Sequence, residues 1–162
     1  MNATKKSVGE KTKALILEKA LEMFREQGFE GATMRDIAKS ANVATGAAYY
    51  YFPSKEAIVA AYYDHVQEAH EAKVRELILG TTDLRERLAI VIYSKLDILK
   101  DDRKFLGALF RYAGEPDHPL SVFGKGTERQ RAHSVGIFRE AIAGAEVSDD
   151  LRQLLQIGRA HV

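Results

Sequence analysis

Apolar side chains recur every three or four residues along nearly all of this 162-residue chain, and no segment alternates with the two-residue period of a half-buried strand. Prolines stand only at positions 53, 116 and 119, so most of these periodic segments are uninterrupted. The pattern predicts an all-α fold. We expect helices at 10–27, 34–40, 45–51 and 55–79, and further helices that begin near 83, 101, 127 and 148.

The composition narrows the class of protein. Hydrophobic residues make up 46% of the chain, which is enough for a packed core, but no apolar run approaches the roughly 20 residues of a membrane span. The first 13 residues are polar and basic and lack the apolar stretch of a signal peptide. The absence of cysteine excludes a disulfide framework and thiol chemistry. We therefore expect a cytoplasmic protein without a membrane partner.

The charge is distributed unevenly. Residues 1–55 hold nine Lys/Arg against six Asp/Glu, which gives +3, whereas the remainder holds fifteen against seventeen, which gives −2. A basic end on a near-neutral chain is compatible with a polyanionic partner such as nucleic acid. A solvated surface explains the asymmetry equally well, so the charge alone does not decide between them.

The pattern around the second and third predicted helices is more specific. These short helices, 34–40 and 45–51, flank a turn at Asn42, and Thr33 is a typical residue to cap the first of them. Ala38 supplies the small contact that two crossing helices of a helix-turn-helix require. A helical hairpin that only packs in a core has the same spacing, so this pattern leaves DNA binding and plain packing both open.

The helix 45–51 ends in three consecutive tyrosines. Successive residues are about 100° apart on a helix, so at least one phenol must be exposed. Exposed tyrosines beside the small residues Thr45, Gly46 and Ala47 suit contacts with phosphates and thymine methyls. Alternatively, Tyr49 and Phe52 belong to the core and the other tyrosines are ordinary surface. In both cases we expect Phe52 to be buried.

Four segments of the first third of the chain form one recognisable pattern. They are Gly28-Phe29, the run Ala32 to Ala38, the run Ala41 to Gly46, and the block Tyr49-Tyr50-Tyr51-Phe52-Pro53-Ser54-Lys55-Glu56. With these segments, residues 11–56 resemble the DNA-binding domain of the TetR family. The resemblance covers a little over a quarter of the chain, and its last block is highly specific. Two positions depart from the usual pattern: Asn42 replaces a common Gly, and Ala48 replaces a larger aliphatic residue.

The resemblance implies that the partner is a double-stranded DNA operator. The first predicted helix of the pair would hold a phosphate at its capped end and reach the major groove with an arginine. The second would touch bases or backbone with its small residues and tyrosines, and a lysine after it would neutralise a phosphate. Lys5, Lys6, Lys11 and Lys13 would add a basic arm. The expected DNA-binding residues are Thr33, Arg35, Thr45, Gly46, Ala47, Tyr49, Tyr50, Tyr51 and Lys55.

The resemblance also implies a C-terminal helical domain that binds a small-molecule effector and forms a homodimer. We expect a helix-turn-helix domain at 1–54 and a regulatory domain at 55–156, and an effector that releases a repressor from its operator. Aromatic and leucine residues at helical spacing are more often ordinary core than pocket. The candidate pocket residues are Tyr62, His65, Tyr93, Phe105, Leu109, Phe110, Tyr112, Phe123 and Phe138.

No pattern indicates catalysis, a cofactor or a metal site. The histidines form no pair at i, i+4, and the segment 124–127 lacks the strand and spacing of a phosphate-binding loop. The acidic pair Asp101-Asp102 is explained by the dipole at a helix start. A regulator that senses no small ligand remains an alternative. A helical enzyme or adaptor with a coincidental hairpin is a further one.

The last six residues, 157–162, do not continue the leucine pattern. They match the translation of a sequencing-library adapter, ATC GGA AGA GCA CAC GTC. We expect the natural sequence to be interrupted near Gln156, which would leave the regulatory domain without its last two helices and expose apolar surface. The alternative is a natural, short C-terminus.

Overall fold

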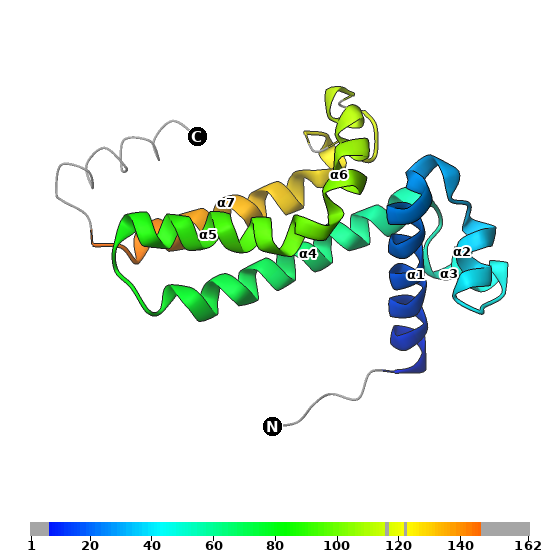
Figure 1. Cartoon of the computed structure of the whole chain (residues 1–162), viewed down its shortest axis with the longest axis horizontal. Helices are drawn as coiled ribbons and strands as arrows, with labels where there is room; N and C mark the ends of the chain where they lie inside the picture. Colours follow the sequence, from blue (N-terminus) through cyan, green and yellow to red (C-terminus); the bar gives the residue numbers. More distant parts are fainter. Residues whose placement is uncertain (1–6, 116, 122, 147–162) are drawn as a thin grey trace. The chain divides into compact units, whose positions relative to one another are not determined.

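The computed structural model describes residues 7–115, 117–121 and 123–146 (Figure 1). Within these ranges the chain is helical and forms no strand, so the predicted all-α class is confirmed. The expected helix from 148, the tail 157–162, and Lys5 and Lys6 lie outside the described residues. The helices are α1 (Val8–Gly31), α2 (Met34–Ser40), α3 (Thr45–Tyr51), α4 (Lys55–Ile78), α5 (Leu84–Leu99), α6 (Arg103–Phe110) and α7 (Glu128–Ala143), with the 3-10 turns η1 (Lys100–Asp102), η2 (Arg111–Gly114) and η3 (Lys125–Thr127).

The described residues form two compact units. The first contains the chain up to Val66 together with Lys100–Gln130, and the second contains Gln67–Leu99 together with the residues from Arg131 onwards. Helix α4 therefore contributes its first half to one unit and its second half to the other. Because α6 belongs to the same unit as α1, α2 and α3, internal packing does not divide the chain at residue 54, and the functional boundary expected there stays a prediction.

Local signals explain the ends of α1. Ser7 and Glu10 form a capping box, in which the Glu10 amide donates to Ser7 Oγ at 3.2 Å and the Ser7 amide donates to a Glu10 carboxylate oxygen at 2.6 Å. Gly28 interrupts the helix with a φ of 81°, a conformation that residues with a Cβ rarely adopt. The chain then returns Phe29 to the last turn, where its ring lies 5.3 Å from that of Phe24.

The core of the first unit joins α1 to the short helices and to α6. Phe24 stacks on Phe105 of α6 with ring centroids 5.5 Å apart, and Phe105 meets Tyr62 of α4 edge-on at 5.7 Å. The expected burial of Phe52 is confirmed, because only 2% of it is exposed. These contacts bury the apolar stripe of α1 and place α2 and α3 beside it (Figure 1).

Asp102 corrects one expectation from the sequence. It precedes α6 but makes no side-chain capping bond, and it is 4% exposed. Arg25 of α1 donates from Nε to Asp102 Oδ1 at 2.5 Å, and the Tyr62 hydroxyl donates to Oδ2 at 2.6 Å. Burial and the adjacent carboxylate raise the pKa of Tyr62. Asp102 is therefore a buried acceptor that ties α1, α4 and the start of α6 together, rather than a residue placed by the helix dipole.

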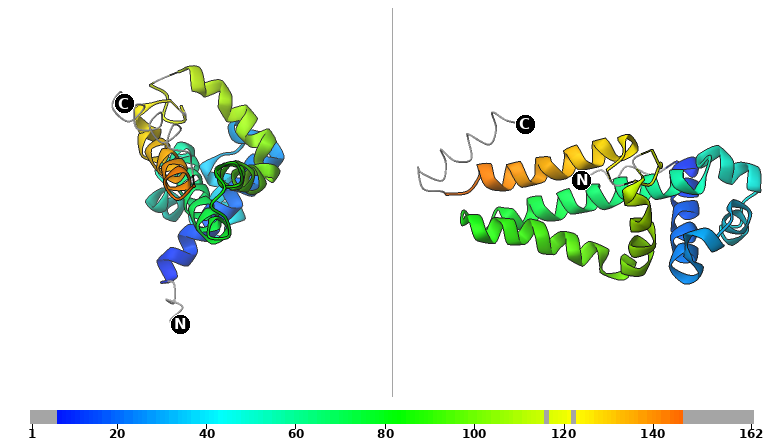
Figure 2. Two further views of the ribbon diagram at one scale, coloured as in Figure 1. Left: turned by 90° about the vertical axis from the view of Figure 1, so that its left-hand side faces the viewer. Right: turned by 90° about the horizontal axis from the view of Figure 1, so that it is seen from above.

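In the second unit, α5 and α7 lie alongside the second half of α4 (Figure 2). Their shared core consists of Val74 and Ile78 from α4, Val91 from α5, and Ile137 and Ala141 from α7. The core is small, and a buried arginine supplements it.

Arg87 of α5 holds the ends of the other two helices in this unit. Its Nε donates to the Ala141 carbonyl at 2.7 Å, and its Nη1 donates to the Ile78 carbonyl at 3.1 Å and the Thr81 carbonyl at 2.8 Å. A helix leaves its last carbonyls without intrahelical partners, so one guanidinium here satisfies acceptors at the ends of both α4 and α7. Gly144 borders this group, and a Cβ at that position would overlap the guanidinium.

A polar network crosses the interior of the same unit. Lys95 Nζ donates to Gln67 Oε1 at 2.6 Å, and burial lowers the pKa of Lys95 to about 8. His70 is 3% exposed, and its Nε2 lies 2.9 Å from the Val91 carbonyl. Because a carbonyl can only accept, Nε2 carries the proton, and the buried Nδ1 has no hydrogen-bond partner among the described residues. Burial lowers the pKa of His70, and the Lys95 and His133 charges lower it further.

Replacing Asp102 by Asn should lower the free energy of unfolding by about 2–3 kcal/mol, because the charge-assisted bond from Arg25 loses its anion. Tyr62→Phe removes only one donor and should lower it by about 1 kcal/mol. Urea denaturation followed by circular dichroism measures both values. Equal stability of Asp102→Asn and the unsubstituted chain would show that the buried ion pair contributes nothing.

Acid should destabilise the second unit through His70. Because the folded-state pKa lies below the unfolded-state value, this contribution to stability is complete above about pH 6.5 and is lost as the pH falls, by at most about 1.4 kcal/mol per pH unit. Denaturation at about pH 7.5 and about pH 5.5 should show a smaller loss for His70→Gln than for the unsubstituted chain. His65→Gln, at an exposed histidine of α4, is the matched control and should keep the original loss. If His70→Gln loses as much stability at low pH as the unsubstituted chain, His70 is not the cause of the acid sensitivity.

Candidate nucleic-acid interface

Helices α2 and α3 begin and end where the sequence predicts. Thr33 caps α2, because its hydroxyl accepts from the Asp36 amide at 3.2 Å and donates to the Asp36 carboxylate at 2.5 Å. The predicted cap is thus confirmed. The phosphate contact expected of Thr33 stays a prediction, and it would compete with Asp36 for the same hydroxyl.

The turn between the helices has the expected left-handed residue. Asn42 has a φ of 53°, and the Val43 amide donates back to the Ala38 carbonyl at 3.0 Å. Ala38, 1% exposed, provides the small contact at the point where the helices meet, and Ala48 of α3 is completely buried. The turn and these two alanines fix which face of α3 packs inward.

The opposite face of α3 is exposed. Tyr49 is 50% exposed and Tyr50 82%, so the expectation that at least one phenol faces solvent is confirmed. Thr45 and Gly46 are also exposed. Apart from the chain neighbours of Gly46 and the adjacent backbone of its own helix, no atom of the described residues lies within 4 Å of the position that a Cβ on Gly46 would take. Ala44 precedes the helix without a side-chain cap. The start of α3 thus offers open backbone beside exposed aromatic rings.

Tyr51 and Ala47 occupy the flanks of this surface. Ala47 is half-buried. Tyr51 is also half-buried, and its hydroxyl would lie 3.3 Å from a Cβ at Gly9 of α1. Its ring meets that of Tyr50 edge-on at 5.1 Å. Tyr51 therefore packs beside the start of α1, whereas Tyr49 and Tyr50 form the outward surface.

The expected cations differ in their surroundings. Arg35 on α2 is exposed, as are Lys11 and Lys13 on α1. Lys55 instead donates from Nζ to the Phe29 carbonyl at 2.6 Å, and the same atom lies 4.5 Å from the centre of the Phe29 ring. Lys55 thus secures the segment that follows Gly28. Its expected phosphate contact stays a prediction.

The candidate pocket residues do not form one cluster. In the first unit, Tyr62, Phe105 and Leu109 are buried in the core. The other members have varied surroundings, and two of them belong to the second unit, so the proposed pocket stays a prediction. In the first unit, Phe110 and Phe123 are 67% and 68% exposed, His65 is also exposed, and Tyr112 is half-buried. In the second unit, Tyr93 and Phe138 are 70% and 38% exposed.

Two features are absent from the described part of the chain. Among those residues no group of three or more His, Cys, Asp or Glu side chains is placed to hold a metal ion. No helix there is both long and apolar enough to cross a membrane.

The sequence did not point to several residues that organise this region. Asp102, Arg25 and Tyr62 meet only because the fold brings together positions that are far apart in the chain. The capping box of α1 was visible as Ser7 and Glu10 with the required spacing, and the helix starts there instead of at residue 10.

Known proteins resemble this chain in sequence and in fold. The family described as "Bacterial regulatory proteins, tetR family" matches residues 16–62. The HTH-type transcriptional regulator UidR of Escherichia coli K12 is 42% identical over 69 residues, which are 43% of this chain and 35% of UidR. The chain thus spans about a third of the length of this curated relative.

Two solved structures extend the likeness beyond the first domain. A putative transcriptional regulator of Pseudomonas aeruginosa PAO1 superposes with a TM-score of 0.60 at 26% identity, covering 94% of this chain and 69% of that one. FadR of Thermus thermophilus, described as a TetR-family transcriptional repressor in complex with lauroyl-CoA, shares the fold with a TM-score of 0.56 at 23% identity, covering 90% and 69%. Residues 16–62, which include the helix-turn-helix of α2 and α3, thus match the tetR family of bacterial regulatory proteins.

Proposed function

We propose that this chain is part of a DNA-binding transcriptional regulator that inserts α3 into the major groove of an operator. The observation that carries the proposal is the division of α3 into two faces. Ala48 is completely buried, whereas Tyr49 and Tyr50 are 50% and 82% exposed. Large exposed aromatic residues on a helix that is fixed from behind suit contact with a partner, and the resemblance at 16–62 supports DNA as that partner.

The dimensions of α3 fit this role. An α-helix with its side chains is about 10–12 Å in diameter, and the major groove is about 12 Å wide, so a helix such as α3 can enter it. The small residues Thr45, Gly46 and Ala47 allow the backbone of α3 to approach the DNA closely. The phenols of Tyr49 and Tyr50 would then contact phosphates and bases. Arg35 from α2 would reach a guanine edge or a phosphate, and Thr33 would stand at the DNA backbone.

We propose that the complete protein is a homodimeric repressor which a small-molecule effector releases from its operator. A dimer presents two recognition helices about one DNA turn, roughly 34 Å, apart. An effector lowers DNA affinity only if it binds better to a state with another spacing. FadR, a repressor solved with lauroyl-CoA, supports an effector in this fold. We place the DNA-binding domain at 1–54, the regulatory domain at 55–156, and the protein in the cytoplasm, where its DNA lies.

The proposal predicts that Tyr50→Ala and Arg35→Ala each weaken binding to the DNA that flanks the protein's own gene by about tenfold or more, the equivalent of about 1–3 kcal/mol for one lost contact. Fluorescence anisotropy of labelled duplexes, repeated over a series of salt concentrations, measures the affinity and its salt dependence.

Tyr93→Ala is the matched control, because Tyr93 is 70% exposed but lies on α5 in the other unit. It should bind DNA like the unsubstituted chain. If Tyr50→Ala and Tyr93→Ala bind with equal affinity, α3 is not the recognition helix. If the unsubstituted chain binds no DNA, the result favours the alternative function of a helical adaptor or enzyme.

A third substitution separates two roles of Lys55. We expect Lys55→Met to lower the free energy of unfolding by about 1–2 kcal/mol, because the Phe29 carbonyl loses a charged donor. The log–log salt slope of DNA binding stays unchanged if this bond is the only role of Lys55. Lys39→Met, at an exposed lysine of α2, controls for the loss of charge. A slope smaller by about 0.9 in Lys55→Met alone would instead assign Lys55 to a phosphate.

A further inference from the structure

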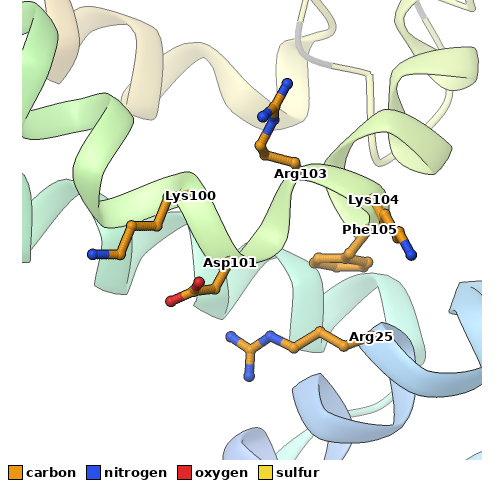
Figure 3. A pocket seen from close by; sticks show the side chains of 6 residues that line it. All are labelled: Arg25, Lys100, Asp101, Arg103, Lys104 and Phe105. Carbon is orange, nitrogen blue, oxygen red and sulfur yellow. The ribbon is translucent and has the colours of Figure 1, made fainter.

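A cavity of about 670 Å³ opens between α1 and the start of α6, within the first unit. Its lining is unusually basic, since it combines four cationic side chains with one carboxylate and a single aromatic ring. In Figure 3 the side chain of Arg103 points away from Arg25 and Phe105. Neither the helix-turn-helix nor the predicted aromatic pocket accounts for this cluster. The lining residues are Arg25, Lys100, Asp101, Arg103, Lys104 and Phe105.

The excess of charge is local. The whole chain carries a formal net charge of only +1, whereas the six lining residues carry +3, from four cations and one anion, and Asp102, the ion-pair partner of Arg25, reduces this local excess to +2. Arg103 and Lys104 are exposed, and neither forms an ion pair or side-chain hydrogen bond in the described part of the chain. Like charges so close together repel each other, and a bound anion would relieve that repulsion.

Arg25 gives the cavity a positioned donor. Its Nε is held by Asp102 at 2.5 Å, which orients the guanidinium, and Figure 3 shows that group extending from α1 towards η1. The two terminal nitrogens make no other hydrogen bond among the described residues. A planar fork fixed at one edge presents its remaining N–H groups to an oxyanion with little further loss of entropy.

The floor of the cavity is closed. Phe105 is 3% exposed, because Phe24 and Tyr62 cover its ring. An apolar ligand therefore gains little contact there, and the accessible chemistry is that of the cations at the rim. Arg103 and Lys104 carry their charges on long, rotatable side chains that can turn towards a ligand held at Arg25.

We propose that this cavity binds a small molecule through a phosphate or diphosphate group. The terminal nitrogens of Arg25 form the fixed part of the site, and Arg103 and Lys104 close over the anion. Arg25 lies on α1 and its guanidinium also holds Asp102, which precedes α6. An anion bound at Arg25 is therefore connected to both segments. The site itself does not depend on the proposed DNA binding, because the ligand is measured without DNA.

Inorganic pyrophosphate is the probe, titrated into the full chain at low ionic strength by isothermal calorimetry. Arg103→Gln/Lys104→Gln removes two cavity charges without touching the Arg25–Asp102 pair. Lys125→Gln/Arg139→Gln removes two exposed charges elsewhere and is the matched control. The unsubstituted chain and the control should bind alike, and the cavity variant should bind roughly fivefold or more weakly.

Three outcomes would overturn the proposal: no saturable binding to the unsubstituted chain, equal weakening in both variants, or no weakening in either. A fourth concerns DNA, whose phosphates have the same chemistry. If the cavity variant keeps its pyrophosphate affinity but binds DNA with a smaller salt slope, the cations serve the DNA backbone and not a small ligand.

Discussion

The buried carboxylate of Asp102 is the interaction on which the first unit depends. Arg25 comes from α1, Tyr62 from α4, and Asp102 itself from the turn before α6, so one acceptor fixes three segments that are distant in sequence. Phe105, which stacks on Phe24, meets the ring of Tyr62, and all three rings are buried. Burial of a charge is tolerated only when its oxygens are satisfied, and here each oxygen has its own donor. Helix α1, against which α2 and α3 pack, is positioned by this arrangement.

The recognition surface is a consequence of how α3 is held. A seven-residue helix is not stable alone, so its orientation comes from packing rather than from propensity. Ala48 and the turn at Asn42 fix its inner face, and the outward direction of Tyr49 and Tyr50 follows from the 100° step between residues. The proposed chemistry of DNA recognition therefore rests on the small residues behind the helix as much as on the tyrosines in front of it.

Short-range signals in the sequence were sufficient to predict several ends and turns of the helices in the first unit. The cap at Thr33, the left-handed turn at Asn42 and the helix break at Gly28 each depend on a residue and its immediate neighbours, and such features can be predicted without a fold. Asp102 and Arg87 could not be, since the partners of each come from other helices. The aromatic residues at helical spacing also gave no guide to a pocket, because the same spacing serves a buried ring such as Phe105 and an exposed one such as Phe110.

The pairing of Arg87 with Gly144 restricts how this sequence can vary. The guanidinium occupies the space that any side chain at position 144 would need, and it serves carbonyls at the ends of two helices. A side chain at 144 would displace it and leave those carbonyls buried without a donor. A substitution at either position should therefore require a change at the other. Related chains that have lost the glycine should also have lost the arginine, and should end α4 and α7 by another means.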